Sequence, residues 1–345
     1  MKVNTRLVSL HPRNVFRISR AARREALNVF LRIERDGISG YGEASANAYY
    51  FETAADVAAK LKTLPAFLEA HPVDSPADIA AIWEESWPLL SPSRAAQCAL
   101  DVALWDWLGK RENLTVTELA LGQKPRPVVS FATIGISSPA ELDHKIAELA
   151  GFPRIKIKSD ESADLSTATR VRSALPGALL AIDANCAWSN VDFAKLSPDL
   201  PPLNLDFIEQ PFPPDLDGQA PDLPIPVIAD ESCVTLEDID RLPPHFAGYN
   251  IKLVKCGGLT PALQMARGAR GRKTMVGCML ESSLLISAGA VVAQLTDYAD
   301  LDGAWLLADD PIQSWSFKSG ALTPSPHPGL GVRPLHPLQP LAFSL

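Results

Sequence analysis

Short apolar runs alternate with longer polar or proline-rich stretches from about residue 128 onward. Most of the gaps between them span about 15 to 20 residues, and the runs are VVSFATIG, RIKIK, LLAIDAN, LDFIEQ, PVIADES, YNIKLVK and TMVGCMLES. Strand-like runs separated by crossover segments predict parallel βα units, and this many units favour a barrel. The sequence therefore predicts an α/β fold.

Residues 1–125 have a different texture, in which short strand-like and helical patterns are mixed. Residues 28–33 (NVFLRI) predict a strand, and residues 93–110 predict a helix that Ser93 can cap. After about residue 310 the chain is again rich in proline and glycine. We therefore expect an N-terminal domain over 1–125, a barrel over 126–310, and a segment over 311–345 that returns to the N-terminal domain.

Composition narrows the class of protein. The 345 residues carry a net charge of −8 and no basic run interleaved with aromatic residues, so a nucleic-acid surface is not expected. The chain has no signal-peptide pattern at its start and no stretch of 18 apolar residues, so no membrane association is expected. Its five cysteines form no CxxC pair, which is typical of a reduced, cytoplasmic protein.

Ionisable residues end five of the apolar runs. They follow one another at intervals of 21 to 26 residues, about one βα unit each: Lys158 (with Lys156), Asp183, Glu209, Asp230 and Lys255. In a βα barrel the carboxyl ends of the strands meet at one rim, where the active sites of such enzymes lie. We therefore expect these groups to surround one pocket.

The charges suggest a chemistry for that pocket. Asp183, Glu209 and Asp230 supply the oxygen ligands that Mg²⁺ prefers, and three unpaired carboxylates would repel one another without a cation. Alternation along a strand places Lys156 and Lys158 on one face; the same alternation aligns Lys255 with the interior and turns Lys252 outward. Two lysine bases on opposite sides of a carbon beside a carboxylate can invert that carbon by a 1,1-proton transfer through an enediolate.

The motifs K-x-K, D-x-N, E-Q-P, A-D-E-S and K-C-G-G, in this order, resemble the enolase superfamily, in its muconate-lactonising-like branch. Lysine bases with Mg²⁺ and an ene-diolate are a known pattern of that superfamily. The resemblance implies a (β/α)7β TIM-like barrel with an N-terminal α+β capping domain. It also implies metal ligands at Asp183, Glu209 and Asp230, and acid/base lysines at Lys158 and Lys255.

Within that branch, stretches such as SRAAQCALDVALWDW, NIKLVKCGGLT and ADLDGAWLLADD resemble dipeptide epimerases, above all those acting on L-Ala-D/L-Glu. The resemblance implies that Asp300 and Asp302 bind the free ammonium of the dipeptide. It implies that Arg23 reads the carboxylate of a glutamate side chain. Thr133 and Glu281 fall at rim positions and are further candidates for contact with the substrate.

The expected function is thus a Mg²⁺-dependent dipeptide epimerase with a small-molecule dipeptide substrate. Two alternatives remain open at this point. One is another activity of the same branch, N-acylamino-acid racemisation or cycloisomerisation, whose substrates lack the free ammonium. The other is a barrel that binds a metal or peptide without catalysis, against which the two lysines argue. The sequence leaves open the second side chain accepted, the oligomeric state, including a homo-oligomer, and the register of the arginines near Arg23.

Overall fold

A computed structural model describes residues 1–219 and 221–335 of the chain. The N-terminal part begins with an antiparallel sheet in the order β1–β4–β5. Its strands are β1 (Lys2–Leu10), β4 (Ala26–Arg35) and β5 (Ile38–Ala44). The strand predicted over 28–33 lies within β4, whose residues from Asn28 to Leu31 are buried.

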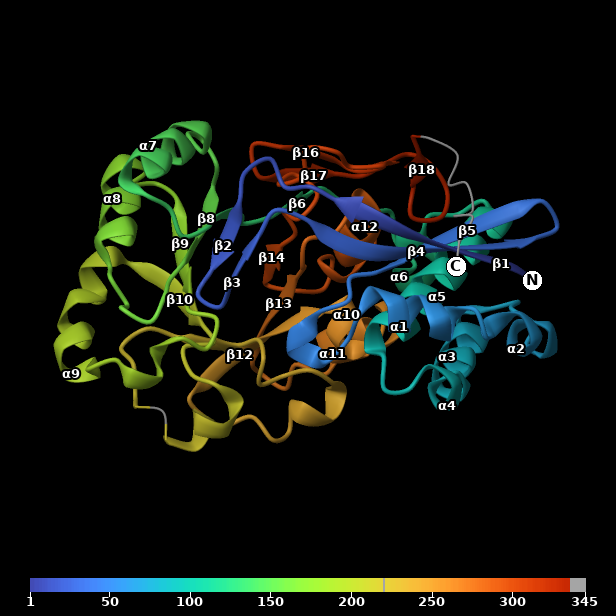
Figure 1. Cartoon of the computed structure of the whole chain (residues 1–345), viewed down its shortest axis with the longest axis horizontal. Coiled ribbons are helices and arrows are strands. Elements are labelled where there is room, and N and C mark those ends of the chain that lie inside the picture. The colour runs from blue at the N-terminus through green and yellow to red at the C-terminus, as the bar shows by residue number, and fades with distance from the viewer. Residues whose placement is uncertain (220, 336–345) are drawn as a thin grey trace.

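Helices pack on one side of this sheet (Figure 1). They are α1 (Ala54–Leu61), α2 (Leu64–Ala70), α3 (Pro76–Glu85), α4 (Trp87–Leu90), α5 (Arg94–Glu112) and α6 (Val116–Leu121). The predicted helix over 93–110 corresponds to α5, and the side chain of Ser93 accepts a hydrogen bond from the Ala96 N–H as its N-cap. Helix α5 lies so close to β5 that a Cβ at Gly42 would come within 1.9 Å of the Ala99 carbonyl oxygen.

The second part is a nearly closed barrel of eight parallel strands. In chain order they are β7 (Ala132–Ile134), β8 (Arg154–Lys158), β9 (Leu179–Asp183), β10 (Leu205–Glu209), β11 (Val227–Ala229), β12 (Phe246–Lys252), β13 (Lys273–Gly277) and β14 (Tyr298–Asp300). Together with the N-terminal α+β part, this confirms the expected fold class. Phe131, Ala181, Phe207, Ile228 and Met275 fill the barrel interior with apolar side chains.

The crossovers between barrel strands are of unequal length. They contain α7 (Pro139–Glu148), α8 (Ser166–Ala174), α9 (Phe193–Leu196), α10 (Leu253–Cys256), α11 (Leu259–Arg267) and α12 (Ser283–Val292). Between β9 and β10 the proline-rich segment forms only α9 and short 3-10 turns. Among the residues that the structure describes, no helix is long and apolar enough to cross a membrane.

Two excursions join the N-terminal part to the barrel. The hairpin of β2 (Phe16–Ile18) and β3 (Ala21–Arg23) lies across the barrel mouth (Figure 1). The C-terminal segment contributes β15 (Ile312–Gln313), β16 (Ser316–Lys318), β17 (Ala321–Thr323) and β18 (Arg333–Pro334), and β17 pairs with β6 (Val128–Val129). Gly329 then bonds through its main chain to Leu114 and Val116. We propose to keep the boundaries 1–125, 126–310 and 311–345, of which residues 336–345 lie outside the described residues.

Candidate active site

Three carboxylates converge at the carboxyl ends of successive barrel strands. Asp183 and Glu209 are register partners at the ends of β9 and β10, and Asp230 directly follows β11. All three side chains are buried, with at most 2% exposed. The three carboxylates repel one another. Burial raises the pKa of Glu209 to about 7, and the negative charges of Asp183 and Asp230 add to this rise. Parallel pairing therefore brings together residues that lie 21 to 26 positions apart in the sequence.

Lys156 and Lys158 of β8 both reach this group. The Lys156 ammonium lies 2.7 Å from Glu209, 3.4 Å from Asp183 and 2.5 Å from Asp300. The Lys158 ammonium lies 2.5 Å from Asp183. Burial alone would raise the pKa of Asp183, yet Lys158 and Lys156 together hold it well below its ordinary value. Both lysines lie on the side of β8 that the alternation predicts.

Lys252 is where the sequence interpretation was wrong. Strand β12 ends at Lys252, which is 6% exposed, and its ammonium lies 2.7 Å from Asp230 Oδ2. The chain then turns into the short helix α10, so the strand alternation does not continue to Lys255. The signal that marks this break is the Gly-Gly of K-C-G-G, since Gly257 and Gly258 adopt φ values of 99° and 136°. Lys252 therefore points inward, contrary to the prediction.

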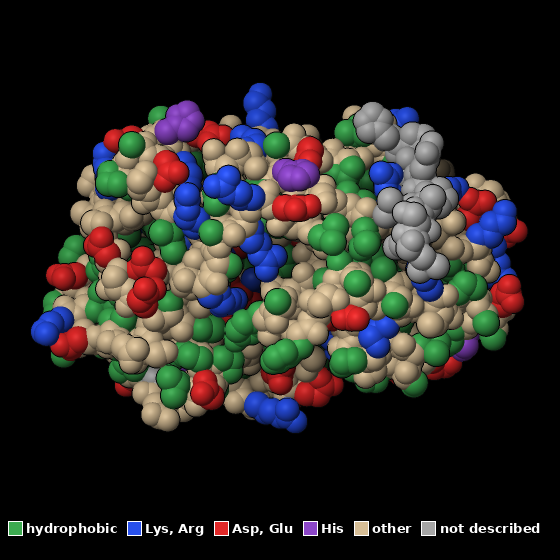
Figure 2. All heavy atoms as spheres, viewed as in Figure 1, with side chains coloured by type: hydrophobic (Ala, Val, Ile, Leu, Met, Phe, Trp, Pro, Cys, Tyr) green, Lys and Arg blue, Asp and Glu red, His purple; other side chains and the backbone are tan. Residues whose placement is uncertain are grey.

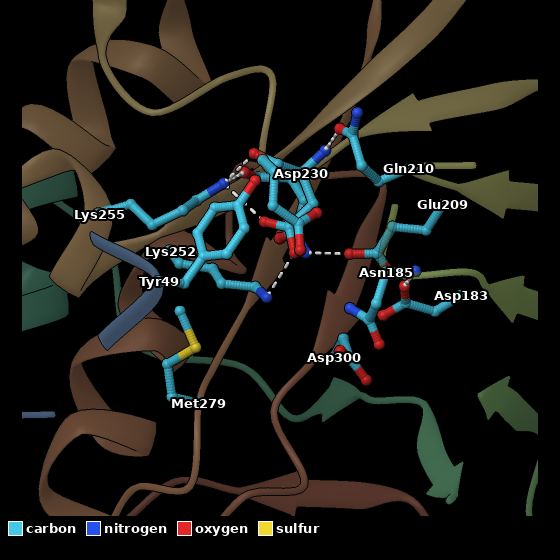
Figure 3. Close-up of polar contacts among 12 residues, drawn as sticks. Tyr49, Asp183, Asn185, Glu209, Gln210, Asp230, Lys252, Lys255, Met279 and Asp300 are labelled. Carbon is cyan, nitrogen blue, oxygen red and sulfur yellow. Dashed lines mark hydrogen bonds and ion pairs between the residues drawn. The ribbon is translucent and has the colours of Figure 1, made fainter. Parts of the chain in front are cut away.

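Lys255 has a different environment from the one expected of a base. Its ammonium is fully buried and contacts four oxygens: Asp230 Oδ1 at 2.7 Å and the main-chain oxygens of Asp230, Cys233 and Asn250 at 2.5, 2.9 and 3.0 Å. Figure 3 shows Lys252 and Lys255 approaching Asp230 from different sides. Four protein oxygens surround an ammonium that has three hydrogens to donate, and the side chain is 0% exposed, so the group holds Asp230 in place.

A cavity of about 730 Å³, counted to its open mouth, lies above the carboxylates. Among the described residues its walls include Lys158, Lys252 and Asp230, and they include neither Lys255 nor Glu281. The sequence placed Glu281 at the rim, but it is buried, its carboxylate accepts a hydrogen bond from the Met279 N–H, and burial raises its pKa to about 8.

Three further predicted residues line this cavity, namely Thr133, Asp300 and Asp302, whereas Lys156, Asp183 and Glu209 are not among its described walls. Asp300 ends β14 and Asp302 follows it, and both carboxylates are buried. Asp302 Oδ2 accepts a hydrogen bond of 2.6 Å from the Thr133 N–H of β7, so Thr133 lies beside this acidic pair. Asp300 is paired with Lys156, and its Oδ1 has no hydrogen-bond partner among the described residues. The pKa of Asp302 is raised to about 7 by burial and by the charge of Asp300.

The hairpin over the mouth brings two arginines to the cavity. Arg20 donates to the Asn185 carbonyl at 2.8 Å and to Glu231 at 2.6 Å, and it stacks 4.4 Å from the centre of the Tyr49 ring. Arg23 also lines the cavity, where burial and then Arg20 lower its pKa. Within the described part of the chain Arg23 forms no ion pair; its contact is with Asn47 at 3.5 Å. Figure 2 shows Lys and Arg side chains gathered on this face of the molecule.

The oxygen atoms available at this site are of the kind that a hard divalent cation prefers as ligands. Asp183, Glu209 and Asp230 offer carboxylate oxygens, and Asn185 Oδ1 and Glu231 Oε2 are buried without hydrogen-bond partners among the described residues. In this geometry lysine ammoniums lie between the carboxylates, and no three acidic, histidine or cysteine side chains of the described residues already converge on one point. The repulsion expected from the sequence is thus balanced by lysines.

Family models match nearly the whole chain. Residues 2–122 match the N-terminal domain of mandelate racemase and muconate lactonizing enzyme, and residues 140–336 match the enolase C-terminal domain-like family. The chain therefore belongs to the enolase superfamily, in the mandelate racemase/muconate lactonizing enzyme branch.

Relatives of similar length share its sequence and its fold. An L-Ala-D/L-amino acid epimerase of Flavobacterium johnsoniae is 36% identical over 96% of this chain and 99% of the relative. The L-Ala-D/L-Glu epimerase of Escherichia coli is 34% identical over 89% and 94%. The structure of a dipeptide epimerase from Methylococcus capsulatus, complexed with Mg and L-Arg-D-Lys, has a TM-score of 0.86 and 30% identity over 96% and 98%. These relatives differ in the dipeptide that each is named for or binds.

Proposed function

We propose that this protein is a Mg²⁺-dependent dipeptide epimerase that inverts the α-carbon of the second residue. One observation carries the proposal: Lys158 and Lys252 lie on β8 and β12, four positions apart around an eight-stranded barrel, and both face the same cavity. The three strands between them carry Asp183, Glu209 and Asp230. A substrate held above these carboxylates would therefore have an amine on each side.

Asp183, Glu209 and Asp230 would hold the Mg²⁺. When bound there, the cation supplies positive charge beside the substrate carboxylate, which favours the charge that develops as the α-proton leaves. Lys158 and Lys252 act on that proton: one amine removes it from one face, and the other ammonium returns a proton to the opposite face. In the reverse direction their roles exchange. Lys255, fully buried against Asp230, takes no part in proton transfer in this proposal.

The ends of the dipeptide find groups of opposite charge in the cavity. Asp302, with Asp300 beside it, would bind the ammonium of the first residue, which separates dipeptides from N-acylated substrates. Arg23, a half-buried guanidinium without an ion-pair partner among the described residues, would bind an acidic second side chain. These contacts favour a free ammonium and an acidic second side chain. Among L-Ala-Xaa dipeptides we therefore propose L-Ala-D/L-Glu as the leading substrate.

The test is deuterium incorporation. The purified protein is incubated in D₂O with Mg²⁺ and with L-Ala-Xaa dipeptides, and mass spectrometry follows the mass of each. A gain of one deuterium at the α-carbon of the second residue of L-Ala-L-Glu, with formation of L-Ala-D-Glu, is the expected result. Exchange confined to other dipeptides would refute the glutamate assignment and retain the reaction.

Two substitutions test the two catalytic assignments. Lys158→Met and Lys252→Met should each lose epimerisation, since each removes one of the two amines that flank the α-carbon. Exchange with N-acetyl-Glu but with no dipeptide would replace the proposal by N-acylamino-acid racemisation. Lack of exchange with either class, in protein shown calorimetrically to bind Mg²⁺, would leave cycloisomerisation and the non-catalytic alternative.

A further inference from the structure

A second cavity opens off the candidate site where β7 and β14 meet. The two cavities share Phe16, Thr133 and Leu306 as common walls. Counted to its open mouth, the second cavity encloses about 470 Å³. Among the described residues Lys158, Asp230 and Lys252 line the first cavity and not the second, so the proposed chemistry leaves the second space unused.

The position of the acidic pair connects this space to the substrate. Asp302 is bonded to the N–H of Thr133, and Thr133 is a wall of both cavities. The ammonium and the side chain of a dipeptide's first residue leave the same α-carbon. With the ammonium at Asp302, that side chain would therefore start beside Thr133. A methyl group would end there, whereas a longer side chain would extend into the second cavity.

The walls of the second cavity favour an uncharged occupant. Its apolar contributors are Pro12, Val15, Phe16, Leu149, Trp305 and Leu306. Its charged groups already have partners: Arg13 pairs with Glu148 at 2.9 Å and lies 4.4 Å from the centre of the Trp305 ring. Lys145 donates to Ser137 at 2.7 Å and has Glu148 as a neighbouring charge. A charged side chain would meet no free opposite charge there, while an apolar one would leave water.

Residues 11–13, which cover one side of this cavity, are joined to the barrel segment 306–308 by main-chain hydrogen bonds. The Arg13 N–H donates to the Leu306 carbonyl at 2.8 Å, and the Ala308 N–H donates to the His11 carbonyl at 2.8 Å. Pro12 and Leu307 form an isolated antiparallel bridge. The space is thus bounded by bonded backbone from both parts of the chain, as in a pre-formed binding pocket.

We propose that the second cavity binds the side chain of the first residue of the dipeptide, and that it takes an apolar side chain larger than methyl, such as leucine. The inference rests on the proposed function and deepens it. It makes the first position a determinant of specificity, with Val15, Leu149 and Trp305 as the residues that set the size accepted.

The experiment compares L-Leu-L-Glu with L-Ala-L-Glu in the D₂O assay, using wild-type protein and two variants. Val15→Trp places bulk in the second cavity, because Val15 lines it from the loop before the hairpin. Leu27→Trp adds the same bulk on the exposed side of β4, where Leu27 is 44% exposed, and serves as the matched control. The quantity measured is the ratio of kcat/KM for L-Leu-L-Glu to that for L-Ala-L-Glu.

We expect a wild-type ratio of at least about ten, since one well-placed methylene is commonly worth that factor. Val15→Trp should lower the ratio at least tenfold, and Leu27→Trp should leave it within about twofold. A wild-type ratio below one, or a ratio that Val15→Trp leaves unchanged, would overturn the inference while L-Ala-L-Glu turnover upheld the proposed function. Absence of exchange with both dipeptides would instead overturn the function, and with it this assignment.

Discussion

Replacing Lys255 by Met tests whether this lysine braces Asp230 or acts on substrate. The substitution keeps most of the side-chain length and removes the ammonium. Four contacts are lost with it, one to Asp230 Oδ1 and three to main-chain oxygens of Asp230, Cys233 and Asn250. Removing one partner of a buried ion pair costs about 3–5 kcal/mol. We expect the free energy of unfolding of Lys255→Met to fall by that amount.

Lys252→Met, at the end of β12, makes the same substitution in the other lysine that contacts Asp230 and serves as the comparison. Lys252 makes one ion pair with Asp230, at 2.7 Å, and faces the cavity, where water can solvate the carboxylate. Its loss should cost about 1.5–3 kcal/mol, the range for a hydrogen bond to a charged group. The two variants therefore differ in opposite directions: Lys252→Met should be the more stable and should lose epimerisation completely, since only Lys158 remains to act on the α-proton. Lys255→Met should retain measurable epimerisation at a temperature where it is folded.

Urea unfolding followed by tryptophan fluorescence gives the two stabilities, and the D₂O assay gives the rates at which the other epimer forms. Calorimetry with Mg²⁺ adds a readout that does not depend on turnover. Lys255→Met should bind Mg²⁺ more weakly, because Asp230 loses its brace. The reasoning is refuted if Lys255→Met unfolds within about 1 kcal/mol of wild type and loses epimerisation, while Lys252→Met retains epimerisation.

Other consequences can be checked with single substitutions. Arg23→Leu should raise KM for L-Ala-L-Glu about 10- to 100-fold, the equivalent of one charged hydrogen bond, and leave kcat/KM for L-Ala-L-Leu within threefold in the same assay. Asp302→Asn should lower kcat/KM for dipeptides at least tenfold without affecting exchange of N-acetyl-Glu, since only the former carry an ammonium. Burial raises the pKa of Asp101 to about 7, so the folded state holds a proton that the unfolded state releases near pH 4. The free energy of unfolding, measured by urea titration, should therefore fall as the pH rises from 4 to 7. Asp101→Asn should make this dependence on pH shallower. Gly258→Ala should destabilise the fold by about 1–3 kcal/mol in the same titrations, because its φ is 136° and a Cβ would lie 2.5 Å from Asp101 Oδ2.

Much of the fold and the position of the three carboxylates follow from local pattern. The apolar runs locate the barrel strands, and Asp183, Glu209 and Asp230 each stand at the end of such a run, which places them at one rim because parallel strands end on the same side. Lys156 and Lys158 also fall on the expected face, because β8 is regular through both residues.

The second lysine could not be located in that way. Alternation gives the correct side only while the strand continues, and β12 stops at Lys252. Beyond it the chain forms α10, which Gly257 caps, and the next residue, Gly258, packs against Asp101 of α5, which also accepts a hydrogen bond of 2.9 Å from the Thr260 N–H. Asp101 lies more than 150 positions earlier in the chain, so these contacts are tertiary. The Gly-Gly pair is the local sequence feature at this turn, and the pairing of Arg20 with Glu231 has no local sequence feature that predicts it.

The contact between Asp302 and Thr133 ties ligand recognition to the integrity of the barrel. Strands β7 and β14 are the two ends of the sheet, and Phe131 N–H to Ala299 oxygen, Leu301 N–H to Ser130 Oγ and Thr133 N–H to Asp302 Oδ2 join them. The last of these joints uses a carboxylate that we assign to the substrate ammonium. Binding of the substrate ammonium at Asp302 should therefore change the NMR chemical shift of the Thr133 amide proton. A variant that lost this acid, and with it the preference for a charged ammonium, would keep the first two joints and leave the Thr133 N–H without its partner.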